Sequence, residues 1–156
     1  MRRKDREIKE FKEIEEIIAK ADVCRVALSD SNVPYIVTMN FGYRKGTKPV
    51  LFFHSAREGK KIEIIRRNNI ACFQMSIEHK LAKTNVKCNC SMKYKSVVGM
   101  GRISFLTEKE DKIEALNCIM SHYFPEEDYR FEDKRVDMTA VLRLEVDEIS
   151  GKKCIP

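Results

Sequence analysis

The chain has 156 residues, of which 35% are charged and 43% hydrophobic, and its formal net charge is +6. This composition is typical of a soluble globular protein, and the length suffices for one core, so we expect one domain over residues 1–156. No apolar run approaches the roughly 20 residues that span a bilayer. No apolar signal core follows the basic residues at 1–6. We therefore predict no membrane segment, no secretory signal and a cytoplasmic protein.

The first half of the chain predicts two helices and three strands. Isoleucines at three- and four-residue spacings predict an amphipathic helix over residues 8–21. Runs rich in β-branched and aromatic residues predict the strands, at 23–28, 35–43 and 50–54. Because short turns join these strands, we expect them to form an antiparallel meander. Ser55 and Glu58 then have the spacing of a capping box, which predicts a helix that continues to Asn69.

The second half predicts a fourth strand over residues 70–77 and a fifth over 93–106. Within the fifth strand, Gly99 and Gly101 indicate a bulge or a close backbone approach. A second capping box at Thr107 opens a helix that ends at Pro125. After an acidic loop, alternating apolar residues predict a last strand over 138–146.

About six strands with local connections and two or three helices predict a mainly β fold. We expect an antiparallel β-barrel with helices packed outside it.

The candidate functional stretch is the junction between strand 50–54 and the helix after it. A helix N-terminus presents free N–H groups and the positive end of its dipole, which suits a phosphate. Lys60 and Lys61 add formal charge there, and Ser55 adds a hydroxyl. The alternative interpretation is that Ser55 only caps the helix and the lysines form a solvated face.

Three other features indicate chemistry less directly. His54 adjoins the junction and could donate a proton to a substrate, although a lone histidine at a strand end is often structural. Cys88 and Cys90 are separated by one residue and have no partner pair, so we predict no metal site. The lysines between 80 and 95 could attract nucleic acid. Tyr94 is the only aromatic residue among them, which disfavours a base-stacking platform.

The motifs also resemble a known family. Phe53-His54-Ser55-Ala56 followed by Glu58-Gly59-Lys60-Lys61 is similar to the flavin-phosphate segment of the pyridoxamine 5'-phosphate oxidase-like flavoproteins. Among these, it most resembles the nitroimidazole-resistance proteins. Other stretches agree with the family in the same order along the chain, at residues 21–25, 34–43, 94–98 and 148–153.

The resemblance implies an FMN-binding split β-barrel that forms a homodimer with the flavin at the subunit interface. It implies an FMN-dependent oxidoreductase whose small-molecule substrate is a nitroaromatic compound. The alternatives are FAD as the cofactor, and a flavin-binding or sensing module without turnover. The implied catalytic residue is His54, and the implied cofactor-binding residues are Thr38, Met39, Asn40, Phe53, His54, Ser55, Lys60, Lys61 and Ser96.

Overall fold

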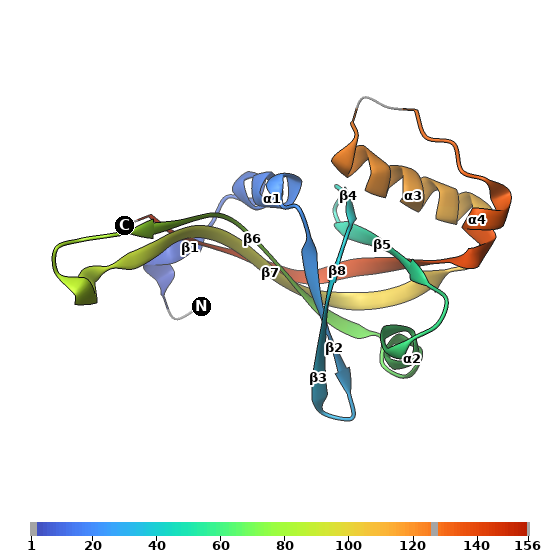
Figure 1. The fold of residues 1–156 in the computed structure, drawn as a ribbon, viewed down its shortest axis with the longest axis horizontal. Helices are drawn as coiled ribbons and strands as arrows, with labels where there is room; N and C mark the ends of the chain where they lie inside the picture. Colours follow the sequence, from blue (N-terminus) through green and yellow to red (C-terminus); the bar gives the residue numbers. More distant parts are fainter. Residues whose placement is uncertain (1–2, 126–127, 156) are drawn as a thin grey trace.

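The computed structural model describes residues 3–125 and 128–155. Its strands form one antiparallel sheet with the order β3-β2-β6-β7-β8-β5-β4, and β1 pairs with β8 (Figure 1). The strands are β1 (Glu7–Ile8), β2 (Cys24–Asp30), β3 (Val33–Met39), β4 (Gly42–Arg44), β5 (Val50–Ala56), β6 (Ile70–Ala82), β7 (Ser91–Leu106) and β8 (Thr139–Cys154). The helices are α1 (Phe11–Lys20), α2 (Lys60–Arg67), α3 (Lys109–Tyr123) and α4 (Asp133–Met138), with 3-10 turns η1 (Lys4–Arg6) and η2 (Lys87–Asn89).

The mainly β fold with flanking helices is confirmed, with an eight-stranded sheet in place of about six strands. The pairing runs from β3 to β4 and does not close. The long strands β6, β7 and β8 lie side by side as its centre, and the β6–β7 hairpin extends away from α3 and α4 (Figure 1).

The main core lies between α1, α2 and the inner face of the curved sheet. Helix α1 buries Ile14, Ile17 and Ile18, as their spacing predicts. Helix α2 buries Ile62, Ile64 and Ile65. Phe11, at the start of α1, is 43% exposed. The core also includes Met39 of β3 and Phe53 of β5. Strands from opposite ends of the sheet therefore contribute side chains to one apolar cluster.

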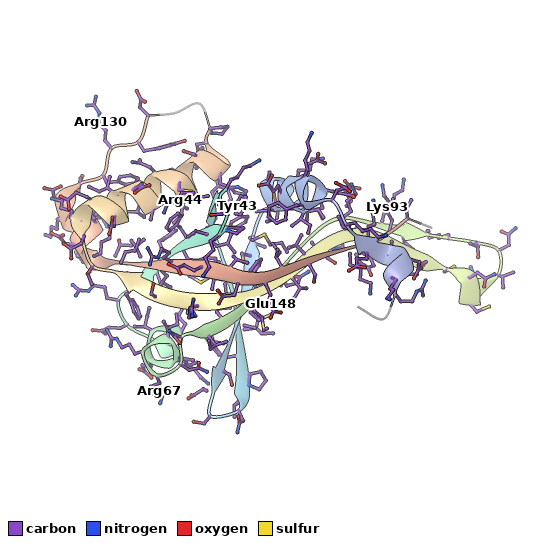
Figure 2. All side chains as sticks on the ribbon, turned by 180° about the vertical axis from the view of Figure 1, so that it is seen from behind. Tyr43, Arg44, Arg67, Lys93, Arg130 and Glu148 are labelled. Atoms are coloured by element: carbon purple, nitrogen blue, oxygen red, sulfur yellow. The ribbon has the colours of Figure 1, made fainter. Side chains whose placement is uncertain are left out.

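A second, smaller core fixes α3 to the opposite face of β5 and β8. It contains Phe52, Ala115, Ile119 and Val141. Arg44 of β4 pairs with Glu114 of α3, and its guanidinium lies 4.6 Å from the centroid of the Phe52 ring (Figure 2). The side chains on one face of β5 therefore pack in the main core, and those on the other face pack against α3.

The predicted meander of the first three strands is confirmed in its pairings but not in its continuity. The segment 35–43 pairs with β2 through β3 and with β5 through β4, but it is interrupted between them, so the two hairpins lie at opposite ends of the sheet order. The predicted strand 35–43 breaks after Met39, where the fully buried Phe41 turns inward, and it resumes as β4. β5 then pairs over its whole length with β8, a partner about 90 residues away that no local pattern can reveal.

Both predicted capping boxes are wrong. β5 continues through Ala56, and α2 begins at Lys60 after Gly59, with no side-chain cap. Likewise, α3 begins at Lys109 without a side-chain cap. At the first site, backbone pairing of β5 with β8 holds Ser55 opposite Ala140, so the sheet ladder replaces the local cap.

The predicted irregularity in β7 is confirmed. The register against β8 shifts between Met100 and Gly101. A Cβ atom on Gly101 would lie 1.8 Å from the carbonyl oxygen of Glu145, so only glycine fits there. The close approach is to β8 of the same chain. None of the described helices has both the length and the hydrophobicity that crossing a bilayer requires.

Candidate functional site

The β5–α2 junction is shaped by Gly59. Its φ of 114° suits glycine, and a Cβ built there would meet nothing within 4 Å, so space is open in front of the helix. The N–H groups of Ile62 and Glu63 donate to the Gly59 carbonyl, at 2.9 and 3.2 Å. Within the described residues, the N–H groups of Lys60 and Lys61 have no backbone acceptor. The helix thus presents free donors and the positive end of its dipole to this space.

Ser55 places an unpaired hydroxyl beside this helix start. Its Oγ is buried, and it has no hydrogen-bond partner among the described residues. A buried polar group without a partner costs about 1–3 kcal/mol. A ligand oxygen at the junction would remove that cost, so this hydroxyl is a local indication that the junction binds a polar ligand.

Lys60 brings the helix start against β3. Its Nζ lies 5.2 Å from the centroid of the Tyr35 ring. β3 is the last strand at its end of the sheet, so every second N–H and C=O along it is free of a strand partner. The junction therefore offers a ligand the free backbone groups of β3 as well as the ammonium groups of Lys60 and Lys61 and the hydroxyl of Ser55.

The other predicted cofactor residues fall in three environments. Thr38 and Asn40 are exposed, whereas the side chains of Met39 and Phe53 are buried in the core and leave only their backbone groups for a ligand. Ser96 lies on β7, where its Oγ donates to the Lys152 carbonyl at 3.4 Å. β2 and β6 separate Ser96 from β3. The structure thus brings Ser55, Lys60 and Lys61 to one junction and keeps Ser96 apart from it.

His54 lies on the face of β5 opposite to Phe53 and Ser55, as alternation along a strand requires. Its exposed side chain lines a mostly apolar pocket of about 220 Å³ between β5, α3 and α4. The other lining residues are Leu116, Ile119, Met120, Phe131, Arg135, Val136 and Thr139. No sequence pattern indicated the residues from α4, because that six-residue helix lies in a segment whose composition predicts an acidic loop.

A large face of the sheet is not covered by any helix or strand among the described residues. Strand pairing carries two rows of side chains across β3, β2, β6, β7 and β8. The apolar members include Ile36, Val98 and Met100, which are 65%, 44% and 43% exposed. The rows are Ile36–Ala27–Cys72–Met100–Glu148 and Thr38–Arg25–Gln74–Val98–Ser150.

The cysteines contribute little to the chemistry of these sites. Burial raises the pKa of the Cys24 thiol to about 12, so it stays protonated and inert at neutral pH. Burial also raises the pKa of Cys118. Within the described residues, no three His, Cys, Asp or Glu side chains are grouped so that they could hold a metal ion.

Comparison with known proteins places these features in a family. The family model described as pyridoxamine 5'-phosphate oxidase matches residues 10–153. No match was found among the curated proteins.

Solved structures agree in fold. One is a protein from Bacteroides thetaiotaomicron, provisionally described as a 5-nitroimidazole antibiotic resistance protein. It is 37% identical, with a TM-score of 0.84 over 94% of this chain and 86% of its own. A flavocytochrome from Azotobacter vinelandii is 18% identical, with a TM-score of 0.84 over 100% of this chain and 72% of its own. An FAD-binding protein from Mesorhizobium loti is 23% identical, with a TM-score of 0.69 over 96% of this chain and 98% of its own.

The match of the family model spans most of the chain, and the relative from Bacteroides is 37% identical over 94% of it. The chain therefore belongs to the pyridoxamine 5'-phosphate oxidase family and, within it, resembles the nitroimidazole-resistance proteins.

Proposed function

We propose that this protein binds a flavin, FMN in the first instance, at the β5–α2 junction and uses it to reduce a small nitroaromatic substrate. The observation that carries the proposal is the buried, unpartnered Oγ of Ser55 beside the helix start that bears Lys60 and Lys61. A flavin phosphate needs cations and N–H donors, and its ring needs backbone hydrogen bonds at one edge. The donor set of the junction and of β3 fits both needs.

Each residue of the junction has a distinct role in this proposal. Lys60 and Lys61 neutralise the phosphate, and the free N–H groups of the first turn donate to its oxygens. Ser55 donates its hydroxyl proton to a phosphate or ribityl oxygen. Free backbone groups around Thr38 and Asn40 orient the ring on β3. When bound, a flavin supplies the reducing equivalents.

His54 would serve the substrate. Its side chain and the apolar residues of α3 and α4 form one pocket, which suits a flat, weakly polar ring. Because His54 lies on the opposite face of β5 from Ser55, this role requires that the reactive part of the flavin ring reaches the pocket of His54. There the imidazole can donate a hydrogen bond or a proton to a nitro oxygen. The name of the relative from Bacteroides supports this substrate class.

We also propose that a second copy of the chain covers the exposed sheet face. The face combines apolar residues with charges of both signs, Arg25 in one row and Glu148 in the other, so it can pair with itself about a two-fold axis. Light scattering of the flavin-loaded protein should give the mass of a dimer. Val98→Glu should shift it to the monomer, because burying an unpaired carboxylate is costly. A monomer mass for the unaltered protein would contradict this proposal.

The visible spectrum of the purified protein tests flavin binding, and the mass of the released cofactor distinguishes FMN from FAD. A colourless protein that takes up neither flavin would overturn the proposal. Anaerobic mixing of the flavin-loaded protein with a 5-nitroimidazole and an external reductant then tests turnover. Binding without turnover would instead identify a flavin-binding or sensing module.

A further inference from the structure

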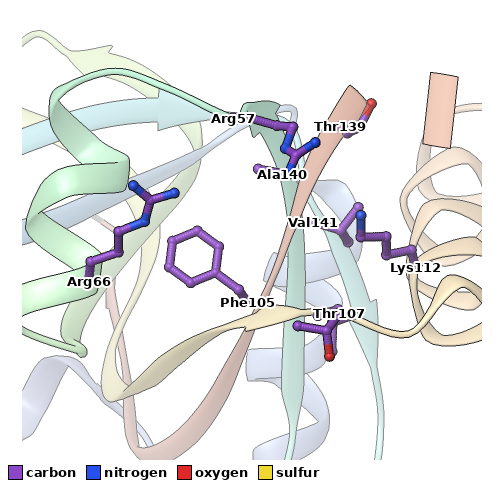
Figure 3. Close-up of a pocket in the computed structure, with 9 residues that line it drawn as sticks. Arg57, Arg66, Phe105, Thr107, Lys112, Thr139, Ala140 and Val141 are labelled. Carbon is purple, nitrogen blue, oxygen red and sulfur yellow. The ribbon is translucent and has the colours of Figure 1, made fainter. Parts of the chain in front are cut away.

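A polar cavity of about 300 Å³ lies beside the end of β7 and the start of β8, between α2 and α3 (Figure 3). Its walls include Arg57, Arg66, Phe105 and Lys112. None of its residues belongs to the predicted flavin set. It shares only Thr139 with the pocket that contains His54.

Three cations from three elements surround this cavity. Arg57 comes from the β5–α2 connection, Arg66 from the last turn of α2, and Lys112 from α3 (Figure 3). In the part of the chain that the structure describes, no acidic residue lines the cavity. Among the described residues, no carboxylate lies within 4.0 Å of any of these three charged groups.

Neighbouring cations behave differently. Arg67, adjacent to Arg66, pairs with Asp30 at 3.1 Å, and Lys109, one turn before Lys112, pairs with Asp133 at 2.7 Å. These two cations outside the cavity thus have acidic partners, whereas the three that line it do not. Three like charges around one small volume repel each other unless an anion lies between them.

The cavity wall also orients the cations and leaves few other donors. The Arg66 guanidinium lies 5.9 Å from the centroid of the Phe105 ring, in cation–π geometry. The Thr139 hydroxyl already donates to the Arg135 carbonyl at 2.8 Å, and that of Thr107 to Glu108 at 3.2 Å. Both threonine hydroxyls thus already have acceptors, so the three cationic side chains are the groups left to bind a ligand. This arrangement favours a multiply charged anion.

We propose that this cavity binds a phosphoryl group, either as a free phosphate species or as part of a small phosphorylated organic molecule. The planar guanidinium groups of Arg57 and Arg66 match phosphate oxygens two at a time, and Lys112 adds a point charge. The volume suits a small ligand. The site shares no residue with the proposed flavin site, although its Arg57 comes from the same β5–α2 connection.

Isothermal titration calorimetry of the flavin-loaded protein tests this, with pyrophosphate and a nucleoside 5'-monophosphate as probes at constant ionic strength. We expect saturable binding of at least one probe. Arg66→Gln/Lys112→Gln should weaken it at least about tenfold, which corresponds to roughly 1.4 kcal/mol. Similar affinity for both probes would identify the phosphoryl group alone as the ligand, whereas tighter nucleotide binding would identify a phosphorylated organic molecule.

The matched control is Lys83→Gln/Lys87→Gln, which removes the same charge from exposed positions of the β6–β7 hairpin. It should bind both probes as the unaltered protein does. If neither probe binds saturably, or if both double variants weaken binding equally, the inference is wrong. If the pocket variant melts early, Arg57→Gln in the exposed connection provides the same test. Loss of flavin from the pocket variant would assign these residues to the flavin site and overturn the inference.

Discussion

Replacement of Ser55 by alanine separates the stability of the empty protein from its affinity for a flavin. Without a flavin, the Ser55 Oγ is buried and has no partner among the residues 3–125 and 128–155, at a cost of about 1–3 kcal/mol. Alanine removes the hydroxyl and fits the same space. The flavin-free variant should therefore be as stable as the unaltered protein, or more stable by about 1 kcal/mol. If Ser55 were a helix cap, the same change would destabilise the protein by about 1 kcal/mol.

The bound state should respond in the opposite direction. A hydrogen bond to a charged phosphate oxygen contributes about 1.5–3 kcal/mol, so flavin affinity should fall by about 10- to 100-fold. Thermal melts with and without added flavin, together with fluorescence titration of the flavin, measure both effects. Ser55→Thr retains the hydroxyl and should retain most of the affinity.

The control is Ser104→Ala on the exposed side of β7, which should change neither quantity by more than about 0.5 kcal/mol. The reasoning would be refuted if Ser55→Ala lowered the stability of the empty protein and left flavin affinity unchanged. That result would mean that the hydroxyl has a partner within the protein and none in the ligand.

Four further outcomes are expected. Lys60→Ala/Lys61→Ala should lose most bound flavin, read from the absorbance ratio, while stability changes by less than about 0.5 kcal/mol. His54→Ala should retain flavin and its melting temperature but lower the rate of nitro reduction. Gly101→Ala should destabilise the protein by about 3 kcal/mol or more in urea melts, because its Cβ would lie 1.8 Å from a backbone oxygen. A hydrogen bond from the Lys153 ammonium lowers the pKa of Glu13 in the folded protein. The stabilisation that Glu13 contributes should therefore be present above its ordinary pKa and disappear as pH falls through the lowered folded value. Urea melts of the unaltered protein and of Glu13→Gln over a series of pH values measure it.

Matched variants isolate these effects. Lys83→Ala/Lys87→Ala removes equal charge and should retain flavin. Gly46→Ala should change stability little, because its Cβ would meet nothing closer than 3.4 Å. If His54→Ala changed neither melting nor reduction, the residue would have no role in either. A constant stability difference for Glu13→Gln across acidic pH would show that its ion pair contributes nothing.

Local sequence determined those features that depend on periodicity or on one residue's shape. The isoleucine spacings of α1 and α2 set their buried faces, because a helix brings residues three and four apart onto one side. Glycine at position 101 signalled the irregularity in β7, because only a residue without a Cβ fits against a neighbouring backbone. The ordered motifs from Ala21 to Lys153 were sufficient to indicate the family.

Only the tertiary structure decided how distant segments meet. The pairing of β5 with β8 moved β5 to the far end of the sheet and held Ser55 in a strand. That pairing also turned His54 toward α3 and α4, away from the junction. The cavity that contains Arg57, Arg66 and Lys112 is built from segments up to 84 residues apart in the chain, from Arg57 to Val141. Hydrophobic periodicity specifies which face of an element is buried but not which element buries it, so these contacts follow from the packing of the whole chain.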